Sequence, residues 1–176
     1  MKSGGILEVV LKGFIYLLIQ FFLLSEVTLF GAAQAWVYIA VIITMPANIP
    51  RIQLLCIALF YGFLVDIFGN TLGMHAACAV LVAFSKDFFL KIFASQIPSS
   101  NNSDGETLTI RTNGLPWFLM YAGSLVFIYQ VAFYFIDSAG FSWLLFTAKK
   151  ILLSTLFTLT VMVILQYIVY PSRTKR

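Results

Sequence analysis

Residues 62–76 read GFLVDIFGNTLGMHA, and Asp66 within them falls inside an apolar run that covers residues 54–68. A lone carboxylate in hydrocarbon costs roughly 2.5–3.5 kcal/mol on insertion scales. Neighbouring groups must therefore compensate for the charge of Asp66. A glycine-containing turn and the single histidine of the chain, His75, follow directly. Most of the functional interpretation depends on this stretch.

The composition is that of an integral membrane protein. Hydrophobic residues make up 61% of the chain and charged residues 10%, whereas ordinary globular domains carry about 25% charged residues. A water-soluble chain of this length could not bury so much apolar surface. The first apolar run is too long and too aromatic for a signal peptide, so we expect it to remain as a helix. The basic residues are scattered at helix ends, which argues against a nucleic-acid partner.

The predicted fold is all-α, a single polytopic membrane domain over residues 1–176. Six transmembrane helices are expected, at residues 7–28, 35–45, 52–68, 72–93, 115–136 and 150–170. The second is short, because eleven residues reach only about 16 Å, roughly half of a hydrocarbon core. It must either tilt into a thinned region of the bilayer or begin as non-helical chain protected by its neighbours.

The remaining segments set the expected orientation. Residues 96–114 are predicted to form a flexible cytoplasmic loop with no core of its own, and residues 141–148 an amphipathic piece before the last helix. With both termini in the cytoplasm, nine of the eleven basic residues lie inside, as the positive-inside rule requires. The inside set is Lys2, Lys12, Arg51, Lys86, Lys91, Arg111, Arg173, Lys175 and Arg176, and the outside set is Lys149 and Lys150.

A stripe of small residues leads to the carboxylate. Ala58, Gly62 and Asp66 recur every four residues and so share one face of the third helix. Small residues at this spacing allow two helix backbones to approach closely. The fourth helix offers a matching surface, which we expect to be Gly73 and Ala77, with Ala76, Ala79 and Ala83 nearby. The two helices are therefore predicted to pack as a tight hairpin, with Asp66 and His75 near its outer end.

Several roles remain open for the polar residues. Asp66 is interpreted first as a structural anchor that accepts backbone N–H groups from the turn at Gly69–Gly73, with Asn70 or Thr71 capping the next helix. An ion or proton site is the alternative. His75 is interpreted as a capping or hydrogen-bonding residue rather than a metal ligand. A bridge from Lys150 to Asp66 or Asp137 is a weaker hypothesis.

No motif indicates catalysis. The sequence contains no CxxC, Walker loop, HExxH, GxSxG or nucleotide-binding fingerprint. Cys56 and Cys78 fall inside apolar stretches, where packing is the expected role. We therefore expect neither an enzyme nor a bound cofactor or metal.

The third and fourth helices resemble those of the rod shape-determining MreD family, particularly its Bacteroidetes-type members. That family carries an apolar helix with a glycine and then an aspartate, a short turn, Leu-Gly and a helix of small residues. The matching features here are Gly62, Asp66, residues 69–71, Leu72-Gly73 and residues 76–79, and upstream Gln20, Gly31, Tyr38 and the turn from Pro46 to Pro50. The basic pair Lys149-Lys150 has no place in the family pattern.

The resemblance implies a non-enzymatic scaffold in the bacterial inner membrane. Its implied partners are an MreC-like bitopic membrane protein, an MreB-like actin filament, and the complex of a RodA-type glycosyltransferase with a class B penicillin-binding protein. Together these would organise lateral peptidoglycan synthesis. The aromatic residues of the first helix and the amphipathic piece then offer a surface either for that partner or for lipid, namely Phe14, Tyr16, Phe21, Phe22, Phe30 and residues 141–148.

A rival function follows from the same resemblance. The family is similar in structure to the substrate-binding S-components of vitamin transporters, so a transporter subunit is the alternative. S-components dock on their energising partner through an Ala-xxx-Ala pattern in the first helix. Residues 7–28 contain no alanine, which favours the scaffold.

Overall fold

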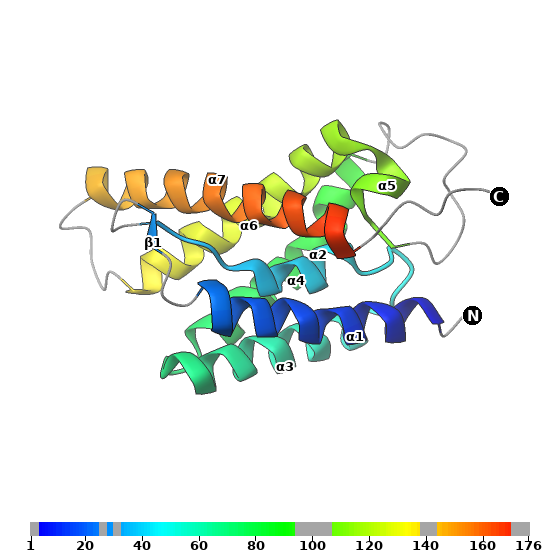
Figure 1. Cartoon of the computed structure of the whole chain (residues 1–176), viewed down its shortest axis with the longest axis horizontal. Helices are drawn as coiled ribbons and strands as arrows, with labels where there is room; N and C mark the ends of the chain where they lie inside the picture. Colours follow the sequence, from blue (N-terminus) through cyan, green and yellow to red (C-terminus); the bar gives the residue numbers. More distant parts are fainter. Residues whose placement is uncertain (1–3, 25–27, 30–32, 94–106, 138–143, 170–176) are drawn as a thin grey trace.

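The computed structural model describes residues 4–24, 28–29, 33–93, 107–137 and 144–169, and these are mostly helical. The elements in chain order are α1 (Gly4–Ile19) with a π-helical continuation (Gln20–Leu24), β1 (Thr28–Leu29), β2 (Ala33–Gln34), a 3-10 turn (Val37–Ile39), α2 (Ala40–Thr44), α3 (Arg51–Gly69), α4 (Met74–Phe93), α5 (Ile110–Asn113), α6 (Leu115–Asp137) and α7 (Leu144–Val169) (Figure 1). The two short strands pair antiparallel. The predicted all-α class is confirmed.

Three helices of the described part of the chain are long and apolar enough to cross a membrane. They are Arg51–Gly69, Leu115–Asp137 and Leu145–Val169. In α1 the apolar stretch Gly13–Phe22 is shorter. The chain therefore has the features of a helical membrane protein, and the number of six crossings stays a prediction from the sequence.

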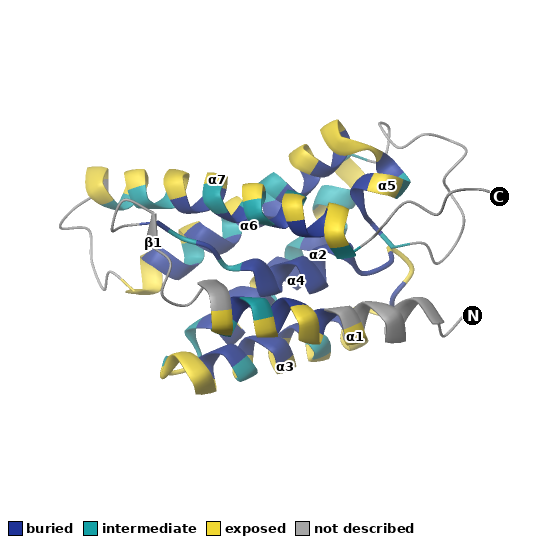
Figure 2. Ribbon diagram, viewed as in Figure 1, coloured by how far each residue is buried: buried dark blue, intermediate teal, exposed yellow. Residues whose placement is uncertain are grey.

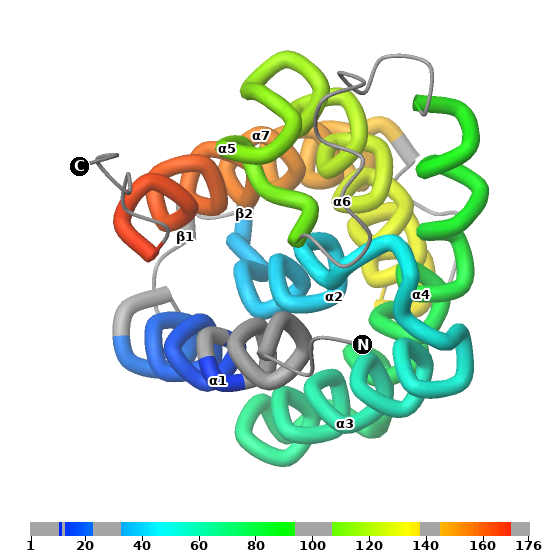
Figure 3. The backbone as a smooth tube through the Cα atoms, turned by 90° about the vertical axis from the view of Figure 1, so that its right-hand side faces the viewer, coloured from blue at the N-terminus to red at the C-terminus, as the bar shows by residue number. Residues whose placement is uncertain are grey.

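The long helices surround a central segment, residues 33–46. Figure 3 shows α1, α3, α4, α6 and α7 arranged around α2, and α3 packs on α4, α4 on α6 and α6 on α7. The start of α1, the end of α7 and the short α5 lie toward one end of the bundle, whereas the turn between α3 and α4 lies toward the other (Figure 1). The outward faces of the long helices are exposed and the central segment is buried (Figure 2).

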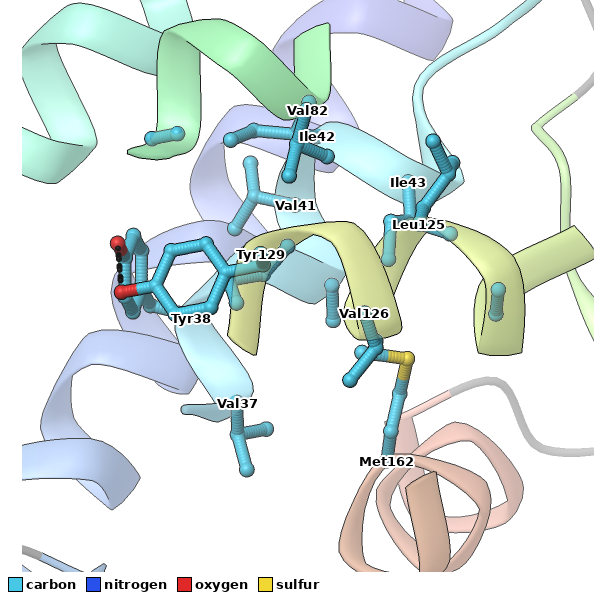
Figure 4. Close-up of a cluster of buried hydrophobic side chains, with 14 of the residues drawn as sticks. Val37, Tyr38, Val41, Ile42, Ile43, Val82, Leu125, Val126, Tyr129 and Met162 are labelled. Atoms are coloured by element: carbon cyan, nitrogen blue, oxygen red, sulfur yellow. Dashed lines mark hydrogen bonds between the residues drawn. The ribbon is translucent and has the colours of Figure 1, made fainter. Parts of the chain in front are cut away.

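The central segment resolves the choice left open for the short second helix. It begins as non-helical chain, passes through the 3-10 turn and becomes α-helical only at Ala40. All its side chains from Val37 to Pro46 are buried. Figure 4 shows Val41 and Ile43 of this segment among Val82 of α4, Leu125 of α6 and other buried residues. The segment thus begins as non-helical chain that neighbouring helices protect, as the second alternative predicts.

Three predicted helices have wrong boundaries. The first was expected over residues 7–28, but it begins at Gly4, and Thr28 belongs to strand β1. The last helix was expected to begin at residue 150 after a separate amphipathic piece, but α7 is continuous from Leu144. Residues 144–148 therefore form its first turns, because no proline or glycine interrupts them, and residues 141–143 lie outside the described residues. The fourth helix begins at Met74 rather than at residue 72.

The predicted flexible loop is also partly wrong. Residues 96–106 lie outside the described part, but residues 107–114 are folded against the bundle. The backbone N–H of Leu108 donates to the carbonyl of Thr44 at 3.0 Å, and that of Ile110 donates to Gln166 Oε1 at 3.0 Å. Leu108 and Ile110 are buried. Although most residues of this segment are polar, the burial of these two apolar side chains and the two hydrogen bonds hold it against the bundle.

Candidate functional site

The Asp66 carboxylate lies at the start of α4, although it belongs to α3. Its Oδ1 accepts hydrogen bonds from Thr71 Oγ1 at 2.6 Å and from the N–H of His75 at 3.0 Å. Its Oδ2 accepts from the N–H of Ala76 at 2.8 Å. The first N–H groups of a helix have no partner within the helix, and the positive end of the helix dipole stabilises an anion there. These contacts compensate for the burial of Asp66 and are those of a structural anchor.

The turn between α3 and α4 brings the carboxylate back to this position. Asn70 ends α3 in the left-handed conformation with φ of 51°, and its N–H donates to the carbonyl of Asp66. Gly73 has φ of 81°, a region that glycine adopts at little cost. The expectation that Asn70 or Thr71 caps α4 is wrong, since Asp66 supplies the oxygens and Thr71 donates to it.

The α3–α4 contact is closest at Gly62. A Cβ atom there would lie 2.5 Å from Cα of Ala76 and 2.8 Å from the carbonyl oxygen of His75. Any side chain at residue 62 would therefore meet backbone that cannot easily move. Ala58, one turn earlier on the same stripe, is fully buried.

The matching surface on α4 differs from the predicted one by one residue. Ala77 is exposed, and a Cβ at Gly73 would meet nothing within 4 Å. Gly69 is also exposed. The buried small residues of α4 are instead Ala76, Ala79 and Ala83. Gly73 serves the turn and not the helix contact, so spacing alone suggested the wrong face of α4.

His75 connects three segments through hydrogen bonds. Its Nδ1 is hydrogen-bonded to the hydroxyl of Tyr129 on α6, and that hydroxyl lies 2.9 Å from the hydroxyl of Tyr38 (Figure 4). Tyr38 also donates to the backbone carbonyl of His75 at 3.3 Å. The imidazole stacks on Phe133, with ring centroids 4.8 Å apart, and meets the edge of Trp36 at 4.2 Å. His75 is thus a buried hydrogen-bonding residue.

The remaining hypotheses for this region find no support in the geometry. No group of three or more His, Cys, Asp or Glu residues that could hold a metal ion occurs among the described residues. Lys150 lies over the ring of Phe146, 5.0 Å from its centroid. Within the described ranges no ion pair joins Lys150 to Asp66 or Asp137, and the oxygens of Asp66 are already occupied.

Sequence reasoning missed the role of Lys86. This α4 side chain is 1% exposed, and its Nζ donates to the carbonyls of Ile42 at 3.2 Å and Met45 at 2.6 Å. The last carbonyls of a helix lack partners within the helix and carry the negative end of its dipole. Lys86 therefore closes the end of α2, together with the Tyr121 hydroxyl on the carbonyl of Ile43 at 3.3 Å. Two features of the sequence could have indicated this role. Lys86 lies inside an apolar helix, and the predicted second helix is too short to span the membrane.

The extended start of the central segment depends on α1. Gln20 Nε2 donates to the carbonyl of Ala35 at 3.0 Å, and the N–H of Val37 donates to Gln20 Oε1 at 2.7 Å. One side chain thus satisfies both kinds of backbone group where no helix does so. Gln20 is one of the residues that carry the family resemblance.

The same segment is also held from α7. The N–H of Gln34 donates to Ser154 Oγ and that of Trp36 to Thr158 Oγ1, both at 3.2 Å. Ser154 and Thr158 are four residues apart and so share one face of α7. In hydrocarbon every backbone polar group needs such a partner, and Ser154 and Thr158 supply two of them here.

The aromatic residues of α1 do not form one surface. Phe14 and Phe22 are exposed, Tyr16 is fully buried, and Phe21 is half-buried. Phe30 lies outside the described residues. The predicted contact surface on α1 is therefore smaller than expected, because part of its aromatic content packs into the bundle.

Comparison with family models, curated proteins and solved structures found no match to this chain.

Proposed function

We propose that this chain is a non-enzymatic scaffold of the bacterial cell-elongation machinery, as its resemblance to the MreD family implies. It would lie in the inner membrane with six crossings and both termini in the cytoplasm, in a bundle similar to that of transporter S-components. Its partners would be an MreC-like bitopic protein, an MreB-like filament, and a RodA-type glycosyltransferase with its class B penicillin-binding protein.

The observation that carries this proposal is that three interior polar side chains bind backbone groups of the bundle itself. Asp66 caps α4, Lys86 closes α2, and Gln20 holds the start of the central segment. Each binds backbone of another element, which gives a rigid bundle. A transporter subunit needs a cavity of about 300–1,000 Å³, whereas the centre of this bundle is filled by residues 33–46, buried from Val37 onward. Filled and internally bonded, the bundle suits a platform better than a carrier.

The surface that we assign to the single-spanning partner is the outward face of α1. Its inward face packs into the bundle at Gly13, Tyr16 and Gln20. The exposed residues recur at helical spacing on the other side, namely Leu11, Phe14, Ile15, Leu18 and Phe22. Apolar side chains presented in this way suit packing against a second transmembrane helix.

The charge distribution supports the proposed orientation. Arg51 at the start of α3, Lys91 in the last turn of α4 and Arg111 on α5 lie at one end of the bundle, the end where α1 starts and α7 finishes. Lys86 is buried, so we no longer count it among the basic residues at the membrane interface. The number of inside basic residues falls from nine to eight. Eight against two remains a clear positive-inside bias.

Affinity purification tests the partnership. The tagged full-length chain would be purified from native membranes of its host in mild detergent, and its partners identified by mass spectrometry. We expect an MreC-like protein to co-purify, and to be lost when Leu18 on the outward face of α1 is replaced by Lys. The control is Ile164→Lys on the exposed face of α7. Purification without such a partner, but with a retained vitamin-like ligand, would favour the transporter subunit.

A further inference from the structure

A hollow lies on the outer surface of the bundle where α3, α4 and α6 meet. Its lining residues are Arg51, Phe84, Ser85, Asp87, Phe88, Phe89, Lys91 and Ile128. Charged groups come from the first residue of α3 and the last turns of α4, and the rest of the lining is mostly aromatic and aliphatic. The hollow thus combines charged and apolar groups.

The lining on α4 runs from Phe84 to Lys91, which is about 10 Å of helix, and Ile128 contributes from α6. The Trp117 indole donates to the carbonyl of Phe93 at 3.0 Å, which places the start of α6 level with the end of α4. From Trp117 to Ile128 is eleven residues, or about 16 Å of helix, and half of a hydrocarbon core is about 15 Å. Ile128 therefore lies about one leaflet's depth from the start of α6.

The charged groups favour an anion. Arg51 and Lys91 outnumber Asp87 in this lining, and Lys91 is exposed. Arg51 lies 4.4 Å from the centre of the Phe84 ring, and its Nε is 3.9 Å from Asp87 Oδ2. That separation is too long for a hydrogen bond. No described residue accepts a hydrogen bond from the Arg51 guanidinium. A phosphate matches the fork geometry of its N–H donors.

We propose that this hollow binds one anionic phospholipid, with its phosphate at Arg51 and Lys91 and one acyl chain along Phe84, Phe88 and Ile128. Basic residues at the cytoplasmic end of transmembrane helices attract anionic headgroups. The ring of Phe84 contacts the Arg51 guanidinium and so holds the cation over the hollow. This inference requires α3, α4 and α6 to lie in the membrane and is independent of the scaffold function.

Native mass spectrometry of the full-length protein in detergent tests the site. It would be titrated with phosphatidylglycerol and, separately, with phosphatidylcholine carrying the same acyl chains. We expect the first phosphatidylglycerol to bind more tightly than phosphatidylcholine. Arg51→Gln or Lys91→Gln should weaken phosphatidylglycerol binding about fivefold. Asp87→Asn should strengthen it, because it removes the negative charge next to the phosphate.

The matched control is Arg111→Gln, which removes one exposed positive charge at the same end of the bundle but outside the hollow. An equal loss in Arg111→Gln, or equal binding of the two lipids by the unmodified chain, would overturn the proposal. Glycerol phosphate and inorganic phosphate at millimolar concentration distinguish the source of the anion. Displacement of the lipid by either would assign the site to a soluble phosphate compound and would also overturn it.

Discussion

The Nζ atom of Lys86 lies 2.6 Å from the carbonyl oxygen of Met45, so that a side chain of α4 caps the end of the short helix α2. At the opposite end of the hairpin formed by α3 and α4, the Asp66 carboxylate of α3 caps the start of α4. Both ionisable groups thus serve helix ends, and each compensates for its own burial by pairing with backbone of opposite partial charge. This division of roles makes the polar interior a set of structural contacts that mutation can test one at a time.

The first prediction concerns Gly62. Leucine at this position should reduce stability by at least as much as Asp66→Asn, because its Cβ would lie 2.5 Å from Cα of Ala76 and force the two helices apart. Asparagine keeps the shape of Asp66 but places an N–H group opposite a backbone donor, a loss of about 1–3 kcal/mol. Thermal unfolding of the purified variants in detergent measures both effects.

Gly69→Ala is the control for this pair, since residue 69 is exposed and its nearest neighbour, Thr71 Oγ1, would be 3.6 Å from the new Cβ. It should melt close to the unmodified protein. If Asp66→Asn abolished function in cells while Gly62→Leu behaved normally, an ion or proton site would replace the structural anchor.

A second prediction addresses Lys86. Replacing it with methionine keeps the volume of the side chain but leaves the carbonyls of Ile42 and Met45 without their donor. We expect stability to fall by about 1–3 kcal/mol. Lys149→Met, at an exposed residue of α7, should change it by less than about 0.5 kcal/mol. Equal melting temperatures for the two variants would show that Lys86 does not hold α2.

The hydroxyl of Tyr129 provides a third test. Tyr129→Phe removes the partner of His75 Nδ1 and of the Tyr38 hydroxyl. The loss of two buried hydrogen bonds should lower stability by about 1–3 kcal/mol. Tyr167→Phe, on an exposed face of α7, makes the same chemical change where no buried contact is lost. A drop in melting temperature that is no larger for Tyr129→Phe than for Tyr167→Phe contradicts the assigned contacts.

A fourth prediction concerns orientation. Cysteines introduced at Ser100 and Ser138 should react oppositely with a membrane-impermeant thiol reagent in intact spheroplasts, with only Ser138→Cys labelled. The parent chain, which retains Cys56 and Cys78 as free thiols, sets the background. Labelling of Ser100→Cys from outside would reverse the orientation derived from the positive-inside bias.

The sequence predicted the features that follow from composition and local periodicity. Hydropathy indicated the helices, and a carboxylate in an apolar run indicated that the surroundings of Asp66 must compensate for its charge. The face of α3 that carries Ala58 and Gly62 also followed from simple spacing. These features depend on residues close together in the chain.

The features that were missed depend on contacts between distant segments. Lys86 was counted as an interface charge because its acceptors, Ile42 and Met45, are far away in the sequence. The contact face of α4 was placed at Ala77 instead of Ala76, because the geometry of the turn, and not residue spacing, sets the rotation of that helix. Residues 107–114 looked like loop because their hydrogen bonds are made to α2 and α7.

Depletion of the protein in a rod-shaped host, with cell length and width measured over successive generations, tests the proposed function most directly. The scaffold predicts that the cells lose their rod shape and become round, and that the unmodified chain restores it while Gly62→Leu does not. Cells that remain rods after depletion, but lose uptake of a vitamin, would contradict the scaffold and support the transporter subunit.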